Sequence, residues 1–249
     1  MKSLTINNFA ELPFDVAEAV NQLRVNLSFT DANIKKIVVT SSVPNEGKSF
    51  IAMNLWRAMA LTGKKVLFVD CDLRASEIID IYDIHSSDTF YGIAHALSGQ
   101  CPVQEVMYKT NVPNGYMIPS VNAVSNPSTL LETKYFKEVL DQVAEVFDYV
   151  IIDTPPAGTV ADALAIGKVA DGNIVVVRSG YTKKALVKDT LDSLKITNKP
   201  LLGIVLNRVD ISRNGSYYYK GYGSYYGNYA KNQKKKKTKK FDNLSQEKI

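Results

Sequence analysis

Short, continuous apolar runs recur along the first 210 residues, and polar or helix-periodic segments separate them. A run that is apolar at consecutive positions, rather than at alternate ones, indicates a strand buried on both faces. The lengths of these runs suit strands better than helices. Strands are therefore predicted at residues 36–41, 65–70, 116–119, 148–153, 172–178 and 201–207.

The intervening segments carry helical periodicity. Residues 47–61 place Ala52, Leu55, Trp56, Met59 and Ala60 along one stripe, as a helix packed on a sheet requires. Further helices are predicted at 128–146 and 182–196, with shorter helices among loops over 88–110. Buried strands that alternate with helices predict a doubly wound α/β domain with a mostly parallel sheet. Ligands of such sheets bind beyond the carboxyl ends of the strands.

The amino-acid composition limits the classes of protein to which this chain can belong. The chain has 249 residues, of which 45% are hydrophobic and 22% charged, so we expect a globular protein with one large domain or two small ones. No apolar run approaches the roughly 18 residues of a membrane span. The N-terminus lacks the pattern of a signal peptide, and two cysteines are too few for a disulfide framework. These features predict a reduced, cytoplasmic protein.

Basic and acidic residues are distributed unevenly along the chain. Residues 211–249 hold 10 Lys and Arg against 2 acidic residues, whereas residues 1–210 hold 20 against 23. The last segment is rich in Gly, Ser, Asn and Tyr, followed by six lysines within 234–240, and is predicted to be disordered. We divide the chain into an N-terminal segment with a helix (1–35), a nucleotide-binding domain (36–210) and a tail (211–249). Seven tyrosines lie in the tail: Tyr217, Tyr218, Tyr219, Tyr222, Tyr225, Tyr226 and Tyr229.

A phosphate-loop pattern follows the first predicted strand. It runs from Ser42 to Ser49 and ends in Gly47-Lys48-Ser49, with Ser42 in place of the usual first glycine. Backbone N–H groups of such a loop surround phosphates, the lysine contacts the β- and γ-phosphates, and the hydroxyl can ligate Mg²⁺. The predicted nucleotide-binding residues are Pro44, Asn45, Glu46, Gly47, Lys48, Ser49 and Phe50, together with Asn207, which ends the last strand and is a candidate for adenine.

Carboxylates follow two other strands. Asp70, Asp72 and Arg74 come after the strand at 65–70, and Asp153 ends the strand at 148–153. Like charges so close are unfavourable unless a cation or a proton lies between them, and a metal-bound nucleotide supplies the cation. These four residues and Lys48 are the candidate catalytic groups.

The order and spacing of these motifs resemble the bacterial tyrosine kinases. The resemblance covers roughly residues 15–230 and implies a P-loop NTPase fold, ATP and Mg²⁺ as cofactors, and autophosphorylation of the tail tyrosines in trans. It implies that Lys48 holds the phosphates, that Ser49, Asp70 and Asp153 serve the Mg²⁺ shell, and that Asp72 supports catalysis. Either Asp70 or Asp72 would orient or deprotonate the attacking tyrosine. Arg74 would organise the loop.

The resemblance also implies partners. It is greatest to the branch of separate cytoplasmic kinases that a transmembrane polysaccharide co-polymerase activates in capsule or exopolysaccharide synthesis, so the kinase would lie at the inner membrane face through that activator. A cognate tyrosine phosphatase is implied as well, and no specific nucleic acid. The family forms rings through a Glu-x-x-Arg-x-x-Arg motif. Here Glu18 and Arg24 match that motif and Asn21 does not.

Two other classes remain as alternatives. A partition- or septum-type switch ATPase shares the fold, but usually has a second lysine where this chain has Val43, and it lacks a tyrosine-rich tail. A nucleic-acid-binding module could use the tyrosines and lysines of the tail, since aromatic rings stack on bases. That class does not account for three acidic residues and a phosphate loop at one edge of a sheet.

Overall fold

The structure is a computed structural model that describes residues 2–87 and 89–210. One compact unit, Met1–Asn207, contains every helix and strand described below, and a second unit begins at Arg208. The predicted disorder and the tyrosine cluster of residues 211–249 lie outside the described residues.

The described strands form one nine-stranded sheet in the order β4-β1-β5-β6-β3-β7-β2-β8-β9. Pairing is parallel except between β1 and β4 and between β5 and β6. The predicted fold class is therefore confirmed. The strands are β1 (Ser3–Ile6), β2 (Lys36–Ser41), β3 (Val66–Asp70), β4 (Ile84–His85), β5 (Tyr108–Thr110), β6 (Gly115–Ile118), β7 (Tyr149–Asp153), β8 (Gly172–Arg178) and β9 (Leu201–Asn207).

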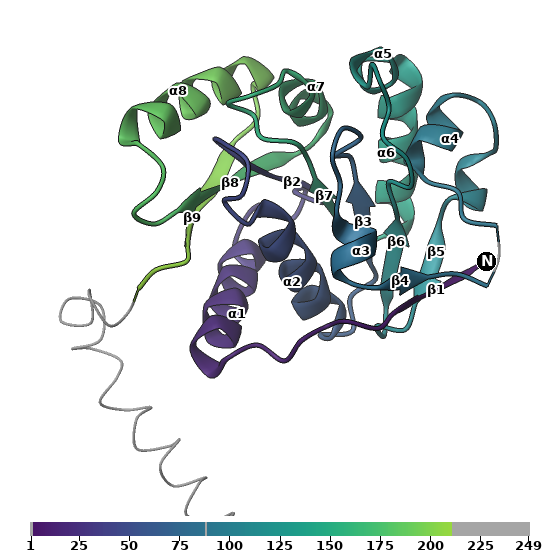
Figure 1. The fold of residues 1–249 in the computed structure, drawn as a ribbon, viewed down its shortest axis with the longest axis horizontal. Coiled ribbons are helices and arrows are strands. Elements are labelled where there is room, and N and C mark those ends of the chain that lie inside the picture. Colours follow the sequence, from purple (N-terminus) through teal and green to yellow (C-terminus); the bar gives the residue numbers. More distant parts are fainter. Residues whose placement is uncertain (1, 88, 211–249) are drawn as a thin grey trace, which may run out of the picture. The chain divides into compact units, whose positions relative to one another are not determined.

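Helices cover both faces of the sheet (Figure 1). One face packs against α1 (Phe14–Ser28), α2 (Lys48–Ala60) and α3 (Ile78–Ile81). The other packs against α4 (Ile93–Leu97), α5 (Ser128–Leu131), α6 (Lys134–Val146), α7 (Asp162–Val169) and α8 (Lys184–Leu194). Short 3₁₀ helices at Val103–Glu105 and Lys195–Thr197 complete the connections.

The continuous apolar strands divide their side chains between the two cores. In β2, Ile37 and Val39 belong to the core that includes α2, whereas Val38 belongs to the core on the opposite face, which includes α6 and α7. In β7, Ile151 joins the first core and Ile152 the second. Because side chains alternate along a strand, a sheet covered on both faces needs apolar residues at every position. The five residues of the predicted α2 stripe are all buried: Ala52, Leu55, Trp56, Met59 and Ala60.

The predicted elements differ from the structure mainly at their ends. The helix predicted over 128–146 is two helices, α5 and α6, separated at Glu132 and Thr133. Thr133 has an extended backbone and its hydroxyl accepts a hydrogen bond from the N–H of Phe136, so it caps the second helix. A local cap of this kind overrides apolar periodicity that continues through the break.

The far edge of the sheet was not predicted. β1 pairs with β5 and β4, so residues of the N-terminal segment belong to the main sheet. β1, β4 and β5 have two to four residues each. Runs this short lack a measurable period, and long-range pairing rather than local pattern decides their conformation.

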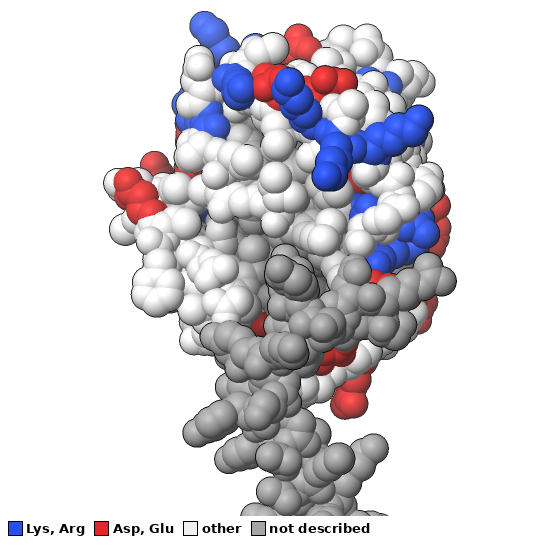
Figure 2. All heavy atoms as spheres, turned by 90° about the vertical axis from the view of Figure 1, so that its left-hand side faces the viewer, with Lys and Arg blue, Asp and Glu red and all other residues white. Residues whose placement is uncertain are grey.

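β9 ends the other edge of the sheet. Leu201, Ile204 and Leu206 are exposed there, while lysines of α8 gather above this edge (Figure 2). In the described part of the chain no helix is long and apolar enough to cross a membrane. Leu201, Ile204 and Leu206 lie on the edge strand of the sheet.

The cap at Thr133 gives a direct test of the α5–α6 break. Replacing Thr133 with Ala should lower the free energy of unfolding by about 1 kcal/mol, because the Phe136 N–H loses its acceptor. Thr133→Ser keeps the hydroxyl and should cost less than half as much. Urea unfolding followed by circular dichroism measures both variants, and equal losses would contradict the capping role.

Candidate functional site

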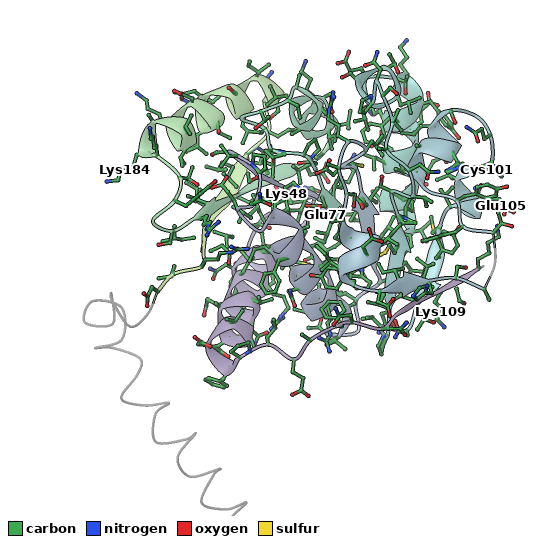
Figure 3. The ribbon with its side chains drawn as sticks, viewed as in Figure 1. Lys48, Glu77, Cys101, Glu105, Lys109 and Lys184 are labelled. Atoms are coloured by element: carbon green, nitrogen blue, oxygen red, sulfur yellow. The ribbon has the colours of Figure 1, made fainter. Side chains whose placement is uncertain are left out.

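The candidate residues converge at the carboxyl ends of β2, β3 and β7. These strands are neighbours in the order β3-β7-β2, so the loops that follow them meet at one edge of the sheet. Lys48, labelled in Figure 3, begins α2 directly after the phosphate loop. The predicted clustering of the phosphate loop with the carboxylates is thus what the topology produces.

The phosphate loop needs unusual backbone angles. Asn45 and Gly47 have φ values of 64° and 90°, in the left-handed region. A Cβ atom on Gly47 would lie 2.1 Å from the amide nitrogen of Asn207. The left-handed conformation therefore favours glycine at position 47, and a larger residue would also have to displace the side chain of Asn207. Phe50 lies in the first turn of α2 with 37% of its surface exposed, and Pro44 lies in the loop.

Lys48 lies among acidic groups. Its ammonium is 2.9 Å from a carboxylate oxygen of Asp72, and both side chains are largely buried. Burial alone would lower the pKa of Lys48, but the charges of Asp153 and Asp72 outweigh it and raise the pKa above its ordinary value. The lysine is therefore held charged at the mouth of the phosphate loop.

Ser49 and Asp153 form a hydrogen-bonded pair at the start of α2 and the end of β7. The Ser49 hydroxyl donates to Oδ2 of Asp153 at 2.6 Å, while Oδ1 of Asp153 is buried and has no hydrogen-bond partner among the described residues. A hydroxyl beside a carboxylate with an unsatisfied oxygen suits the oxygen-preferring Mg²⁺. Among the described residues no three His, Cys, Asp or Glu side chains form a metal cage. The donors present suit a metal that phosphates and water also ligate.

Asp70 lies beside Asp153 on the neighbouring strand. The two are register partners, and Asp70 accepts hydrogen bonds from the N–H of Asp72 and the hydroxyl of Ser76. Burial and the charge of Asp153 raise the pKa of Asp70 to about 8. Burial also raises the pKa of Asp153, to about 6, although Lys48 opposes this. Two buried carboxylates in contact therefore compete for protons in the absence of a cation.

Arg74 ties the loop after β3 to α7. Its guanidinium forms a two-pronged ion pair with Asp162, at 2.5 and 3.1 Å, and Ser128 donates to the same carboxylate at 2.7 Å. Burial would raise the pKa of Asp162, but the hydrogen bonds from Arg74 and Ser128 lower it below its ordinary value. The organising role of Arg74 in the loop stays a prediction.

Glu46 and Asn207 contact the chain itself. The carboxylate of Glu46 accepts hydrogen bonds from the backbone of its own loop, and the amide of Asn207 donates to the Glu46 carbonyl oxygen at 2.8 Å. Asn207 thus lies against the phosphate loop, and its role toward adenine remains a prediction.

Sequence reasoning missed four polar residues of this region. They have no motif of their own, because each acts through a contact made in the folded chain: Ser76, Ser128, Asp162 and Thr182. Only Asp162 carried a signal, as an acidic residue in the first turn of a helix, where acidic side chains are common.

The chain matches known proteins over most of its length. A protein family described as AAA domain matches residues 27–201. Tyrosine-protein kinase CpsD of Streptococcus agalactiae is 34% identical over 208 residues, which cover 84% of this chain and 89% of that protein. Tyrosine-protein kinase YwqD of Bacillus subtilis strain 168 is 32% identical and covers 82% and 86%. The chain belongs to the bacterial tyrosine-protein kinases of the CpsD type.

Solved structures agree with this assignment. The chimerical protein CapA2B2 has 32% identity and a TM-score of 0.74, covering 82% of this chain and 92% of the other. The kinase domain of Escherichia coli tyrosine kinase ETK has a TM-score of 0.70 at 25% identity and covers 78% and 77%. The septum site-determining protein MinD from Pyrococcus horikoshii, at 23% identity with a TM-score of 0.60, shows only the shared P-loop ATPase fold. That fold implies ATP binding.

The buried carboxylates make the stability of the free protein depend on pH. A carboxyl whose pKa is raised in the folded state contributes stability that is full below its unfolded value, near 3.8, and is lost as pH rises toward 8. Asp70→Asn removes the repulsion with Asp153, so it should raise the unfolding temperature at pH 8 by roughly 2–8 °C and change it little at pH 4.

Thermal unfolding by calorimetry without nucleotide measures this effect. Asp189→Asn, on the exposed side of α8, is the matched control and should behave like wild type at both pH values. A stabilisation of Asp70→Asn that is equal at pH 4 and pH 8 would show that charge repulsion is not its cause.

Proposed function

We propose that this protein transfers the γ-phosphoryl group of ATP to tyrosine and autophosphorylates its C-terminal cluster in trans. The observation that carries the proposal is the meeting of Lys48, Ser49, Asp72 and Asp153 at the end of the phosphate loop. Membership of the CpsD-type kinases and the seven tyrosines of residues 217–229 support tyrosine as the acceptor.

Each residue at the end of the phosphate loop would have its own role in phosphoryl transfer. Lys48 would bind the β- and γ-phosphate oxygens in place of its present contact with Asp72, and its charge would stabilise the transition state. Ser49 and Asp153 would hold Mg²⁺, with Asp70 beside them. When bound, this cation neutralises charge on the β- and γ-phosphates.

The transfer is an in-line displacement. The tyrosine oxygen forms a bond to the γ-phosphorus while the bond to the β–γ bridging oxygen breaks and ADP leaves. The phenol proton passes to the carboxylate of Asp70 or Asp72. Arg74 acts through Asp162 by holding the loop that carries both carboxylates.

The switch-ATPase alternative receives less support. This chain has Val43 where that class usually has a second lysine. The two MinD structures share 23–24% sequence identity with this chain, which supports a common fold alone.

Lys48→Met tests the kinase. Purified protein incubated with Mg·ATP should gain phosphoryl groups that peptide mass mapping locates on tyrosines 217–229, and Lys48→Met should gain fewer than about one hundredth as many, since it loses the charge on the phosphates. Lys109→Met, at an exposed position of β5, is the matched control. The experiment is run with and without the cytoplasmic tail of the membrane activator.

Two outcomes would contradict the proposal. Undiminished phosphorylation by Lys48→Met would show that the phosphate loop is not the site. ATP hydrolysis without phosphotyrosine, even with the activator, would favour the switch ATPase.

A variant with all seven tail tyrosines replaced by Phe should still bind ATP.

We propose that the kinase regulates capsule or exopolysaccharide synthesis and export. Its partners would be a transmembrane activator, through which it lies at the inner face of the membrane, and a cognate tyrosine phosphatase. Similarity to the chimerical protein CapA2B2 and to CpsD supports an activator of this kind.

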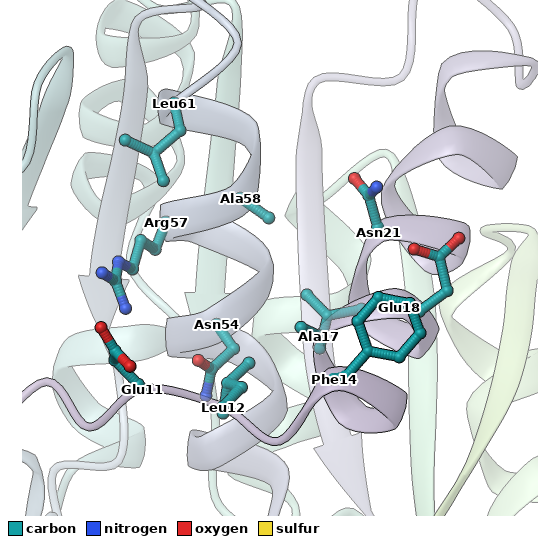
Figure 4. Close-up of a pocket in the computed structure, with 11 residues that line it drawn as sticks. Glu11, Leu12, Phe14, Ala17, Glu18, Asn21, Asn54, Arg57, Ala58 and Leu61 are labelled. Carbon is teal, nitrogen blue, oxygen red and sulfur yellow. The ribbon is translucent and has the colours of Figure 1, made fainter. Parts of the chain in front are cut away.

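We further propose assembly of the kinase into a ring through α1. Glu18 and Asn21 line a groove of about 440 Å³ between α1 and α2, opposite Arg57 (Figure 4). Asn21, which replaces an arginine of the family's motif, accepts two hydrogen bonds from Arg24, at 3.0 and 2.9 Å. The neutral residue thus fixes the remaining arginine and keeps a charged surface next to the groove.

Replacing both Glu18 and Arg24 with Ala should convert oligomers to monomers, because both charges of this surface are lost. Sedimentation velocity at several protein concentrations measures the change. Glu138→Ala, on α6, is the control and should leave the distribution unchanged. Wild-type protein that remains monomeric at all concentrations with Mg·ATP would contradict ring formation.

A further inference from the structure

Glu46 is an acidic residue buried inside the phosphate loop. None of its surface is exposed. A carboxylate in such a place must be paired or fully hydrogen-bonded, because taking its charge out of water is costly. The described contacts of Glu46 contain no ion pair with Lys or Arg side chains, so hydrogen bonds satisfy it.

Four donors surround the carboxylate. Oε2 accepts the backbone N–H groups of Ser42 and Val43, at 2.6 and 2.8 Å. Oε1 accepts the N–H of Arg178 at 3.0 Å and the hydroxyl of Thr182 at 2.5 Å. The first two donors belong to the phosphate loop, Arg178 ends β8, and Thr182 lies in the segment between β8 and α8. The side chain therefore joins two segments that are 132 to 136 residues apart.

The backbone of the same residue makes a third connection. Its carbonyl oxygen accepts the side-chain amide of Asn207, at the end of β9. The phosphate loop is thus attached at Glu46 to the ends of both strands that follow β2 in the sheet order, β8 and β9.

We infer that Glu46 is a positioning residue, which holds the phosphate loop in its binding shape by anchoring it to Thr182 and the backbone of Arg178. The inference rests on the proposed binding of ATP by that loop. In this inference the side chain of Glu46 hydrogen-bonds to donors of the protein itself rather than to the nucleotide. Thr182, which lies outside every motif, then helps to support nucleotide binding.

The physical reason is preorganisation. The loop has a left-handed angle at Asn45, which costs a residue other than glycine some free energy that surrounding contacts must offset. A loop already held in the bound shape loses less conformational freedom when a phosphate binds, so affinity is higher. Hydrogen bonds to a charged acceptor are stronger than neutral ones, which suits them to this task.

Thr182 offers a milder test than Glu46, whose replacement leaves buried N–H groups without an acceptor and endangers folding. Thr182→Val has nearly the same shape but no hydroxyl, whereas Thr182→Ser keeps the hydroxyl. Thr129→Val is the matched control, because its exposed hydroxyl donates to the carbonyl of Asn126. The full chain is titrated with a fluorescent ATP analogue and Mg²⁺ well below its unfolding temperature, and unfolding without nucleotide is recorded in parallel.

Thr182→Val should raise the Kd of the nucleotide about tenfold, which corresponds to about 1.4 kcal/mol. Thr182→Ser and Thr129→Val should stay within about twofold of wild type. The rate of tyrosine phosphorylation by Thr182→Val should recover at saturating ATP, because weaker uniform binding raises KM and leaves kcat.

Three outcomes overturn the inference. A wild-type Kd for Thr182→Val shows that the anchor does not affect binding. Equal losses in Thr182→Ser and Thr182→Val show that the hydroxyl is not the cause. A lower unfolding temperature with an unchanged Kd shows a structural role only. Failure of the wild-type chain itself to bind ATP is distinct, since it refutes the proposed function and this inference together.

Discussion

The mutual repulsion of buried carboxylates is the constraint on which this structure depends. Asp70 and Asp153 lie side by side on neighbouring strands with Asp72 close by, and the ammonium of Lys48 is the cation that contacts this group. Uptake of protons relieves the repulsion, as the raised pKa values of Asp70 and Asp153 show. A second cation brought by the substrate would relieve it better. The free protein therefore concentrates negative charge at the place where it would bind Mg·ATP.

The rest of the fold holds these charges in place. Helices on both faces keep β3, β7 and β2 rigid and their carboxyl ends adjacent. Arg74 and Asp162 secure the loop after β3, and Glu46 secures the phosphate loop from the other side. Both anchors are charge-assisted, and each joins a motif loop to a residue outside the motifs. The carboxylates at the centre of the site repel one another, so the two anchors at its periphery are needed to keep the site from opening.

Two classes of protein share this fold. A P-loop ATPase fold accounts for nucleotide binding, and it occurs in MinD as well as in the kinases. What distinguishes a kinase is the acceptor it phosphorylates, and in this chain the proposed acceptor tyrosines lie beyond the described residues. In the proposed function, specificity depends on which tyrosines reach the site.

The sequence alone determined the fold class, the central strands and the motif residues, because apolar runs buried on both faces and a phosphate loop between strand and helix are local patterns. It also placed Lys48, Asp70, Asp72 and Asp153 at one edge, since parallel strands share their carboxyl ends. The tertiary structure decided what those residues contact. The short strands β1, β4 and β5, the partners Asp162 and Thr182, and the hydrogen bonds of Glu46 to Arg178 and Thr182 all depend on segments far apart in the chain. Such contacts leave no local period, so only folding brings them together.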